Sequence, residues 1–190
     1  MERNELLQAL RRLGELVPPG TEILLAGGAA LILAGYIERG TDDGDVVHSQ
    51  PSLATLSDSI AAVAEERNLS TRWLNDGVKA WSDVLPADFE ARLEEVGTFG
   101  DLRVRRLGRL DLLVMKFFAL REEDLEDLER MAPTDEEIAF VRSQLGRIAR
   151  IGPDKALRMQ LYLDQGEDLR SAPTTERGDP IPREGKSRDI

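Results

Sequence analysis

The chain has 190 residues, 41% of them hydrophobic, and a formal net charge of −11. A chain of this length and hydrophobic content is expected to form one globular domain with appended segments. Cysteine is absent and His48 is the only histidine, which excludes disulfides, thiolate metal sites and a cysteine nucleophile. The acidic excess argues against binding nucleic acid over the whole surface, although Arg103, Arg105, Arg106 and Arg109 form a local basic patch.

The first half of the chain predicts helices and strands in alternation. Leucines at helical spacing indicate an amphipathic first helix, which Pro18-Pro19-Gly20 ends. The pair Gly27-Gly28 then separates two apolar stretches, as expected where a buried strand turns into a buried helix. We predict helices over about 2–16, 29–37 and 51–67, and strands over 22–26, 43–48 and 69–74.

The second half is expected to be mainly helical. Its irregular part, 77–87, contains Trp81 as an apolar anchor, and Thr134 with Glu137 has the pattern of a capping box at a helix start. Gly152-Pro153 is expected to end that helix. We predict strands over 89–96 and 102–107 joined by a turn at 97–100, and helices over 110–120, 121–131 as its continuation, 134–151 and 154–165.

These elements predict an α+β fold, in which a small mixed β-sheet with packed helices is followed by a helical C-terminal part. We assign residues 1–132 to the core and 133–166 to the C-terminal helices. Residues 167–190 are rich in Pro, Gly, Ser and charges and poor in apolar residues, so we predict a disordered tail there. Apolar runs of membrane-spanning length and a secretory signal are absent, so we expect a cytoplasmic protein with no membrane contact.

Two aspartates, Asp43 and Asp45, occupy alternate positions of the second predicted strand. Side chains two residues apart on a strand point to the same face, so both carboxylates should face one way. Such a pair repels unless a cation binds between its members or one of them is protonated. The spacing alone also fits a plain polar turn over 41–44, because Asp and Gly are common turn residues.

Groups of residues follow one another in a recognisable order along the chain. They are Gly27-Gly28, Arg39-x-Thr41-x-Asp43-x-Asp45, Trp73-Leu74-Asn75-Asp76, and Lys116 followed by Arg121-Glu122-Glu123-Asp124-Leu125-Glu126-Asp127. The series resembles the nucleotidyltransferase superfamily with the DNA-polymerase-beta-like fold, over roughly residues 5–131. More closely, it resembles the bacterial AbiEii-type toxins and a related uncharacterised nucleotidyltransferase family.

The resemblance implies a phosphate site beside a metal site. Backbone N–H groups of Gly27, Gly28 and Ala29 would bind nucleotide phosphates at a helix N-terminus. Asp43 and Asp45 would hold Mg²⁺ or Mn²⁺, which prefer such hard oxygen ligands.

The remaining matched residues would act around that site. The resemblance implies that Arg39, Thr41 and Arg121 bind the nucleotide or its phosphates and that Lys116 contacts the triphosphate. One of Asp124 and Asp127 would orient Arg121 or act as a base. On one continuous helix Lys116 and Asp127 would share a face but lie about 16 Å apart, too far to pair.

Structural alternatives exist for several of these residues. Lys116 can be a lysine that reaches the surface from an apolar helix, and Asp124 and Asp127 can belong to an exposed acidic face. His48 can be a polar residue at a strand end.

Three departures separate this chain from the pattern that it resembles. Gly44 stands between the aspartates where an apolar residue is usual, and glycine weakens a strand and can loosen the metal site. Ala29 stands where many superfamily members have serine. A third metal carboxylate is not evident, since Asp101 and Asp76 are only distant candidates.

The resemblance implies a metal-dependent nucleotidyltransferase that moves a nucleoside monophosphate from an NTP to an acceptor. It suggests a tRNA 3′ end or a protein side chain as the acceptor, and a toxin of a toxin–antitoxin system with an antitoxin partner. The departures leave an alternative, in which the fold is catalytically impaired and acts as a binding module for a nucleotide or a partner protein.

Overall fold

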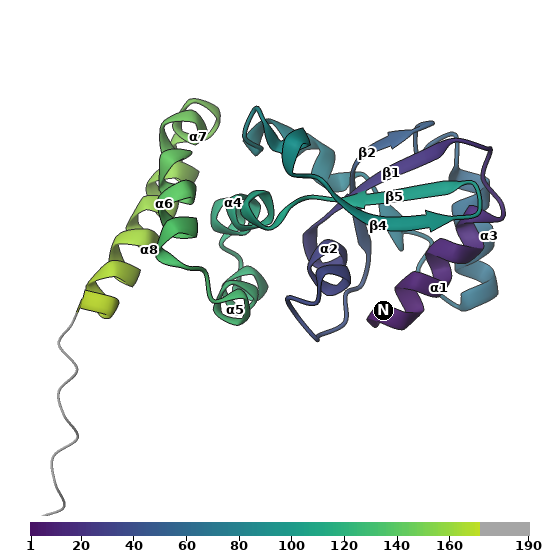
Figure 1. Cartoon of the computed structure of the whole chain (residues 1–190), viewed down its shortest axis with the longest axis horizontal. Helices are drawn as coiled ribbons and strands as arrows, with labels where there is room; N and C mark the ends of the chain where they lie inside the picture. The colour runs from purple at the N-terminus through teal and green to yellow at the C-terminus, as the bar shows by residue number, and fades with distance from the viewer. Residues whose placement is uncertain (172–190) are drawn as a thin grey trace, which may run out of the picture.

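The computed structural model describes residues 1–171, and for residues 79–81 and 167–171 it describes the backbone alone. Figure 1 shows a sheet with helices packed below it, and a group of further helices at one end of the sheet. The architecture confirms the predicted α+β fold with a helical C-terminal part. Within the described residues, no helix combines the length and apolar character needed to cross a membrane.

The sheet has five strands in the order β3-β2-β1-β5-β4. The central strand β1 pairs with β2 in antiparallel and with β5 in parallel orientation, and β3 and β4 form the two edges. The strands are β1 (Thr21–Ala26), β2 (Gly44–Gln50), β3 (Leu74–Asn75), β4 (Glu94–Phe99) and β5 (Leu102–Arg106).

Helices cover the face of the sheet that carries Ile23, Leu25 and Val104, all of which are buried. The first helix buries its leucine stripe there, and Gly14 at its end touches the carbonyl of Phe99, where a Cβ would lie only 1.7 Å from the oxygen. The elements of this core besides the strands are α1 (Arg3–Gly14), α2 (Gly27–Ala34) and α3 (Ser57–Arg67), with short 3₁₀ helices η1 (Gly77–Val84) and η2 (Phe89–Arg92).

The C-terminal helices pack around α4, whose residues 111–119 are all buried. Apolar side chains of α7 and α8, among them Ile148, Met159 and Leu163, join the same core as the sheet. The helices are α4 (Arg109–Ala119), α5 (Glu122–Met131), α6 (Asp135–Ser143), α7 (Leu145–Ile151) and α8 (Pro153–Ser171).

Two predicted strands differ in the structure. The strand predicted over 69–74 is only Leu74–Asn75, because Trp73 N–H bonds to the carbonyl of Ser70 in a turn and the indole is fully buried. The segment 89–96 begins with a turn of 3₁₀ helix, and its strand starts at Glu94 and runs on to Phe99. A bulge between Glu95 and Gly97 lets the strand pass the glycine at which we expected a turn.

Predicted helices also differ. The helix predicted over 51–67 begins only at Ser57. The helix over 134–151 is divided at Gln144 into α6 and α7, while the predicted capping box at Thr134 and Glu137 is present. The last helix, α8, runs to Ser171, so it covers the first residues of the segment that we predicted as a tail. The rest of that segment, 172–190, and the side chain of Trp81 lie outside the described residues.

Candidate functional site

The turn between β1 and α2 requires glycine for two separate reasons. Gly27 has a φ of +59°, and a Cβ there would lie 2.1 Å from Oδ2 of Asp45. At Gly28 a Cβ would lie 2.8 Å from Oγ1 of Thr41. The turn thus brings bare backbone against two predicted site residues, at the start of a helix whose first N–H groups can bind an anion.

The two aspartates meet at this turn. Asp45 lies in β2 and pairs with Ala26, the last residue of β1, while Asp43 directly precedes β2. Burial, followed by the charge of Asp43, raises the pKa of Asp45 above its usual range. The fold therefore holds a partly buried carboxylate beside a second one, an arrangement that a bound cation would stabilise.

The neighbouring strand β3 contributes an amide to the pair. Asn75 is opposite Asp45 in the β2–β3 ladder, and its Nδ2 donates a hydrogen bond of 2.8 Å to Oδ2 of Asp43. Gly44 lets β3 approach, because its N–H bonds to the carbonyl of Trp73 at 2.6 Å and a Cβ would lie 3.0 Å from Leu74. Gly44 is buried and has a packing role here, which differs from the loosening that we expected of it.

The predicted continuous helix over 110–131 is wrong, and the error matters for the site. Leu120 has a φ of +46° and ends α4, and the chain folds back into α5. Nζ of Lys116 therefore lies 2.7 Å from Oδ1 of Asp124 and 2.8 Å from Oδ2 of Asp127. The expected separation of about 16 Å between Lys116 and Asp127 does not occur.

These three side chains are buried, which excludes the surface alternatives. Lys116 is 4% exposed, and Asp124 and Asp127 are 0% exposed. Burial is the largest effect on both carboxylates and opposes their ionisation. Hydrogen bonds and charges of their cationic neighbours outweigh it, so the pKa of each aspartate is lowered.

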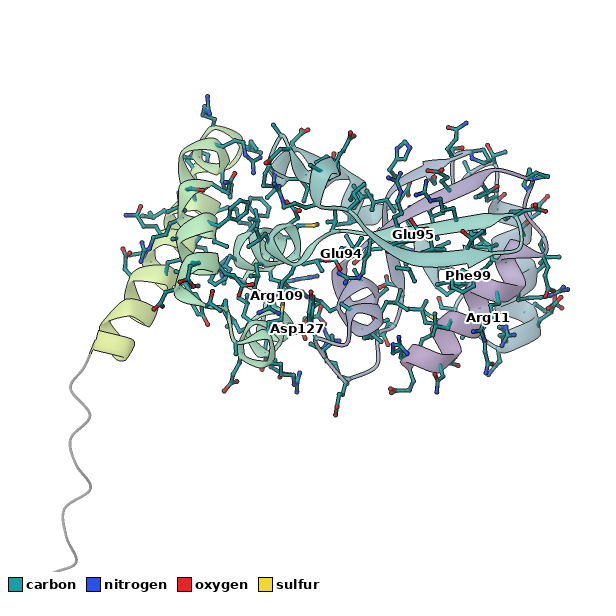
Figure 2. The ribbon with its side chains drawn as sticks, in the orientation of Figure 1. Arg11, Glu94, Glu95, Phe99, Arg109 and Asp127 are labelled. Carbon is teal, nitrogen blue, oxygen red and sulfur yellow. The ribbon has the colours of Figure 1, made fainter. Side chains whose placement is uncertain are left out.

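Two arginines extend the pairing at either end. Arg39, from the loop after α2, contacts Asp127 through Nε at 2.8 Å and through its terminal nitrogen at 2.7 Å. Arg121 bonds Asp124 through Nε at 2.8 Å. Figure 2 shows Asp127 on the side of α5 that faces α2. The result is a chain of alternating charges, Arg121–Asp124–Lys116–Asp127–Arg39, that joins α4 and α5 to the loop before β2.

A cavity of about 290 Å³ lies where these parts meet. Its lining contains both acidic and basic side chains. It is lined by Gly27, Gly28, Arg39, Gly40, Thr41, Asp42, Asp43, Asp45, Lys116, Arg121 and Glu123. A larger cavity of about 610 Å³ lies between α5 and α8, but its lining contains none of the predicted site residues.

The donor set fits a magnesium ion that shares its coordination with a substrate. Mg²⁺ in proteins is commonly held by one or two carboxylates, with waters and substrate phosphates as the other ligands. Asp43 and Asp45 supply two carboxylates in one small polar cavity. Among the side chains that the structure describes, no group of three or more acidic or histidine residues is arranged to hold a metal, so a fully protein-built cage is absent among them.

A family model described as a nucleotidyltransferase of unknown function (DUF6036) matches residues 4–136. The chain belongs to this nucleotidyltransferase family. The matched range runs from α1 to the start of α6 and includes every residue that lines the 290 Å³ cavity. No curated protein and no solved structure matches the chain. The match confirms the superfamily that we identified, whereas the closer likeness to AbiEii-type toxins stays a prediction.

The structure of this nucleotidyltransferase-family chain brings most predicted site residues together. Asp124 and Asp127 lie directly behind the cavity, paired with Lys116. Ala29 is buried in α2 and is not part of the lining. The roles assigned to all these residues remain predictions.

Some neighbours of the site were not predicted. Asn75 was part of the resemblance but had no role, and Glu123 and Asp42 had none either, although both line the cavity. The candidates for a third carboxylate lie elsewhere, because Asp101 is at the opposite end of β1, bonded to Thr21, and Asp76 lines a separate small hollow. The contact of Asn75 with Asp43 follows only from strand pairing, since β3 is too short to leave a pattern of its own in the sequence.

Proposed function

We propose that the chain is a magnesium-dependent nucleotidyltransferase that moves a nucleoside monophosphate from an NTP to an acceptor hydroxyl. The observation that carries the proposal is the 290 Å³ cavity lined by both carboxylates and cations, in a chain that belongs to a nucleotidyltransferase family. Its cationic side chains suit a triphosphate, and its carboxylates suit the metal ion that accompanies one.

In the proposed reaction, the acceptor oxygen bonds to the α-phosphorus while the bond from that phosphorus to the bridging oxygen breaks. Pyrophosphate leaves with the electron pair, and the acceptor proton passes to solvent. Mg²⁺, held by Asp43 and Asp45, would neutralise charge on the phosphate oxygens and on the leaving group. Mn²⁺ has the same ligand preference and would serve as a substitute.

The protein's own groups position the triphosphate. Backbone N–H groups at Gly27 and Gly28 can donate to phosphate oxygens without interference from side chains. Arg121 lies at the mouth of the cavity with 60% of its side chain exposed, and it is suited to meet the incoming phosphates. Asp124 acts through Arg121 and Lys116, which it holds, and is thus a positioning residue.

Lys116 and Arg39 can both contact the nucleotide and both pair with Asp127. Each lines the cavity and is at the same time bound by Asp127. Their cationic groups are therefore held in place before a nucleotide arrives. This reduces the side-chain entropy that is lost when the nucleotide binds. We assign Asp127 to the positioning of these two cations rather than to the role of a base, because its carboxylate is already occupied on both oxygens.

The test is transfer of label from α-³²P-labelled NTPs, supplied one at a time with Mg²⁺ and cellular RNA or lysate. Asp43→Asn with Asp45→Asn is the inactive variant, and Asp58→Asn, an exposed aspartate of α3, is the control. Transfer by the wild type and the control but not by the double variant supports the proposal. No transfer with any NTP, or transfer by the double variant, overturns it.

A binding module is the second candidate. It is favoured because, among the described side chains, no third acidic group is arranged with Asp43 and Asp45 to hold a metal, although Asp42 and Glu123 line the same cavity. Titration calorimetry with each NTP distinguishes the two functions. Binding that does not need Mg²⁺ and gives no turnover favours the module, whereas Mg²⁺-dependent binding with turnover rejects it.

The acceptor and the biological role rest on the resemblance alone. We propose a tRNA 3′ end or a protein side chain as acceptor and a toxin role with an antitoxin partner. Induced expression in a bacterial host tests the toxin role. Growth arrest by the wild type but not by the Asp43→Asn, Asp45→Asn variant supports it, and equal growth of both strains overturns it.

A further inference from the structure

A second cavity, of about 480 Å³, opens on the face of the sheet opposite the buried side chains of Ile23 and Val104. It lies between the strands and the two 3₁₀ helices. Its apolar floor consists of Leu24, Val47, Phe89 and Leu93, and its polar rim consists of His48, Ser82, Glu90 and Arg105. The volume is within the range of about 300–1,000 Å³ that is typical of small-molecule sites.

A β-bulge places this cavity on the same sheet face as the metal-site carboxylate. Asp45 and His48 are three residues apart, so they would face opposite sides of a regular strand. The β1–β2 register shifts between Leu24 and Leu25, and Val47 is the extra residue. Asp45 therefore pairs with Ala26 and His48 with Leu24, and both side chains lie on one face.

The two sites are close enough for one ligand. Ala26 and Leu24 are two residues apart on β1, which corresponds to about 7 Å along the strand. A ribose spans a comparable length between a phosphate and its base. A nucleotide with its phosphate beside Asp45 can thus place its base over Leu24.

The rim offers both kinds of hydrogen-bonding group. His48 and Ser82 can each donate and accept, and Glu90 accepts. His48 and Glu90 are exposed, and within residues 1–171 their side chains have no hydrogen-bond or ion-pair partner. Arg105 is held by Glu22 at 3.2 Å, so its position is fixed beside the cavity.

The floor offers an aromatic surface. Phe89 is half-buried, and its ring belongs to the lining together with aliphatic side chains. Nucleobases stack on aromatic side chains with little dependence on sequence, and their edges carry donors and acceptors. An apolar floor with one aromatic ring and a mixed polar rim matches that chemistry.

We propose that this cavity binds a nucleobase, stacked on Phe89 with its polar edge toward His48. The proposal rests on the proposed function for the phosphate at Asp45, but binding of the base itself needs no catalysis. The base belongs either to the NTP or to the terminal nucleotide of an RNA acceptor. Both sources present the same planar heterocycle.

His48 provides a direct test, because it is the only histidine of the chain. In protein labelled with ¹³C at histidine alone, the imidazole gives a single set of NMR signals that reports on this cavity. We expect these signals to shift with at least one of adenosine, guanosine, cytidine and uridine, without metal. Ribose 5-phosphate and pyrophosphate, which lack a base, should leave them unchanged.

Substitution of Phe89 tests the stacking. Phe89→Leu keeps an apolar side chain and removes the ring, so the nucleoside affinity should fall by about tenfold. Phe99→Leu, a half-buried phenylalanine at the end of β4 that does not line the cavity, is the control and should not change it. Glu90→Gln alters an exposed rim residue without risk to folding and should change which nucleosides bind best. Nucleosides that leave the His48 signals unmoved, or affinities unaffected by both Phe89→Leu and Glu90→Gln, overturn the proposal.

Two further titrations identify the source of the base. If Phe89→Leu weakens binding of Mg²⁺ with a non-hydrolysable NTP, the cavity holds the donor's base. If it weakens binding of a short RNA with a free 3′ hydroxyl, the cavity holds the acceptor's base. If label is transferred but nucleosides do not shift the His48 signals, the nucleobase site is refuted and the proposed transferase is not. Shifted His48 signals without label transfer refute the proposed transferase and leave the nucleobase site standing.

Discussion

The ammonium of Lys116 lies 2.8 Å from the carboxylate of Asp127, although eleven positions of one helix would separate them by about 16 Å. The fold closes this distance by ending α4 at Leu120 and turning the chain back into α5. Both groups are buried, and Asp127 also binds Arg39 from the loop before β2. The pair therefore connects the C-terminal helices to the part of the core that carries Asp43 and Asp45.

The first prediction concerns the stability of this pairing. Asp127→Asn leaves Arg39 and Lys116 with less compensation in a buried place, so the free energy of unfolding should fall by about 3 kcal/mol or more. Urea denaturation measures it. Asp88→Asn, which removes an exposed partner of Arg92, is the control and should leave stability almost unchanged. Equal effects of the two substitutions would show that the buried pairing is not stabilising the fold.

The second prediction concerns acid denaturation. The pKa values of Asp124 and Asp127 are lowered in the folded protein, relative to an unfolded value of about 3.9. Their stabilisation is therefore complete above that unfolded value and is lost as the pH falls through the lower folded pKa values. The urea midpoint should drop as the pH falls below about 4, and less steeply in Asp127→Asn. Parallel pH profiles for both proteins would contradict the lowered pKa values.

The third prediction concerns Asp45, which should make the metal-free fold more stable, not less, as the pH falls. The pKa of Asp45 is raised by burial and by Asp43, so its ionised form destabilises the metal-free fold at neutral pH. This penalty is lost as the pH falls through the raised pKa. Asp45→Asn should therefore raise the melting temperature at pH 7 without metal, and the gain should vanish in acid.

Melting temperatures measured with and without Mg²⁺ test whether Asp45 binds the ion. The ion should raise the melting temperature of the wild type in the presence of NTP, because it binds the folded state only. It should not stabilise Asp45→Asn. Asp101→Asn, in the exposed β4–β5 turn, should behave as the wild type in both conditions. A metal-independent melting temperature for the wild type would argue against the assigned metal site.

The fourth prediction concerns the glycine turn. Gly27→Ala combines a φ of +59° with a Cβ placed 2.1 Å from Asp45, so it should reduce both stability and nucleotide affinity. Gly20→Ala has a similar φ of +79° but nothing within 4 Å, and it should show only the backbone cost of about 1–2 kcal/mol. Calorimetric titration with Mg²⁺ and NTP compares them. Equal affinities would mean that the close approach of Gly27 and Asp45 is not needed for binding.

The sequence predicted those parts of the fold that depend on interactions between residues close together in the chain. The apolar run before Gly27-Gly28, the leucine stripe of α1 and the capping box at Thr134 all appear as expected. The superfamily followed from the order of matched residues, and the family match confirms it.

The remaining features depend on tertiary contacts. Leucine rarely adopts a positive φ, so no sequence signal marks Leu120 as the end of α4. The bulge at Val47 and the two-residue strand with Asn75 exist only through pairing with neighbouring strands. For this reason the ion pairs of Lys116 and the alignment of His48 with Asp45 became visible only in the structure.

The central claim is that this cavity transfers a nucleoside monophosphate, and the fate of two labels tests it most directly. Parallel reactions with NTP labelled at the α or at the γ phosphate, with Mg²⁺ and acceptor, distinguish the bonds that can break. We predict α label in the acceptor and an equal amount of γ label in pyrophosphate, both abolished in Asp43→Asn with Asp45→Asn. Label from the γ position in the acceptor, or its release as orthophosphate without α label in the acceptor, would contradict nucleotidyl transfer.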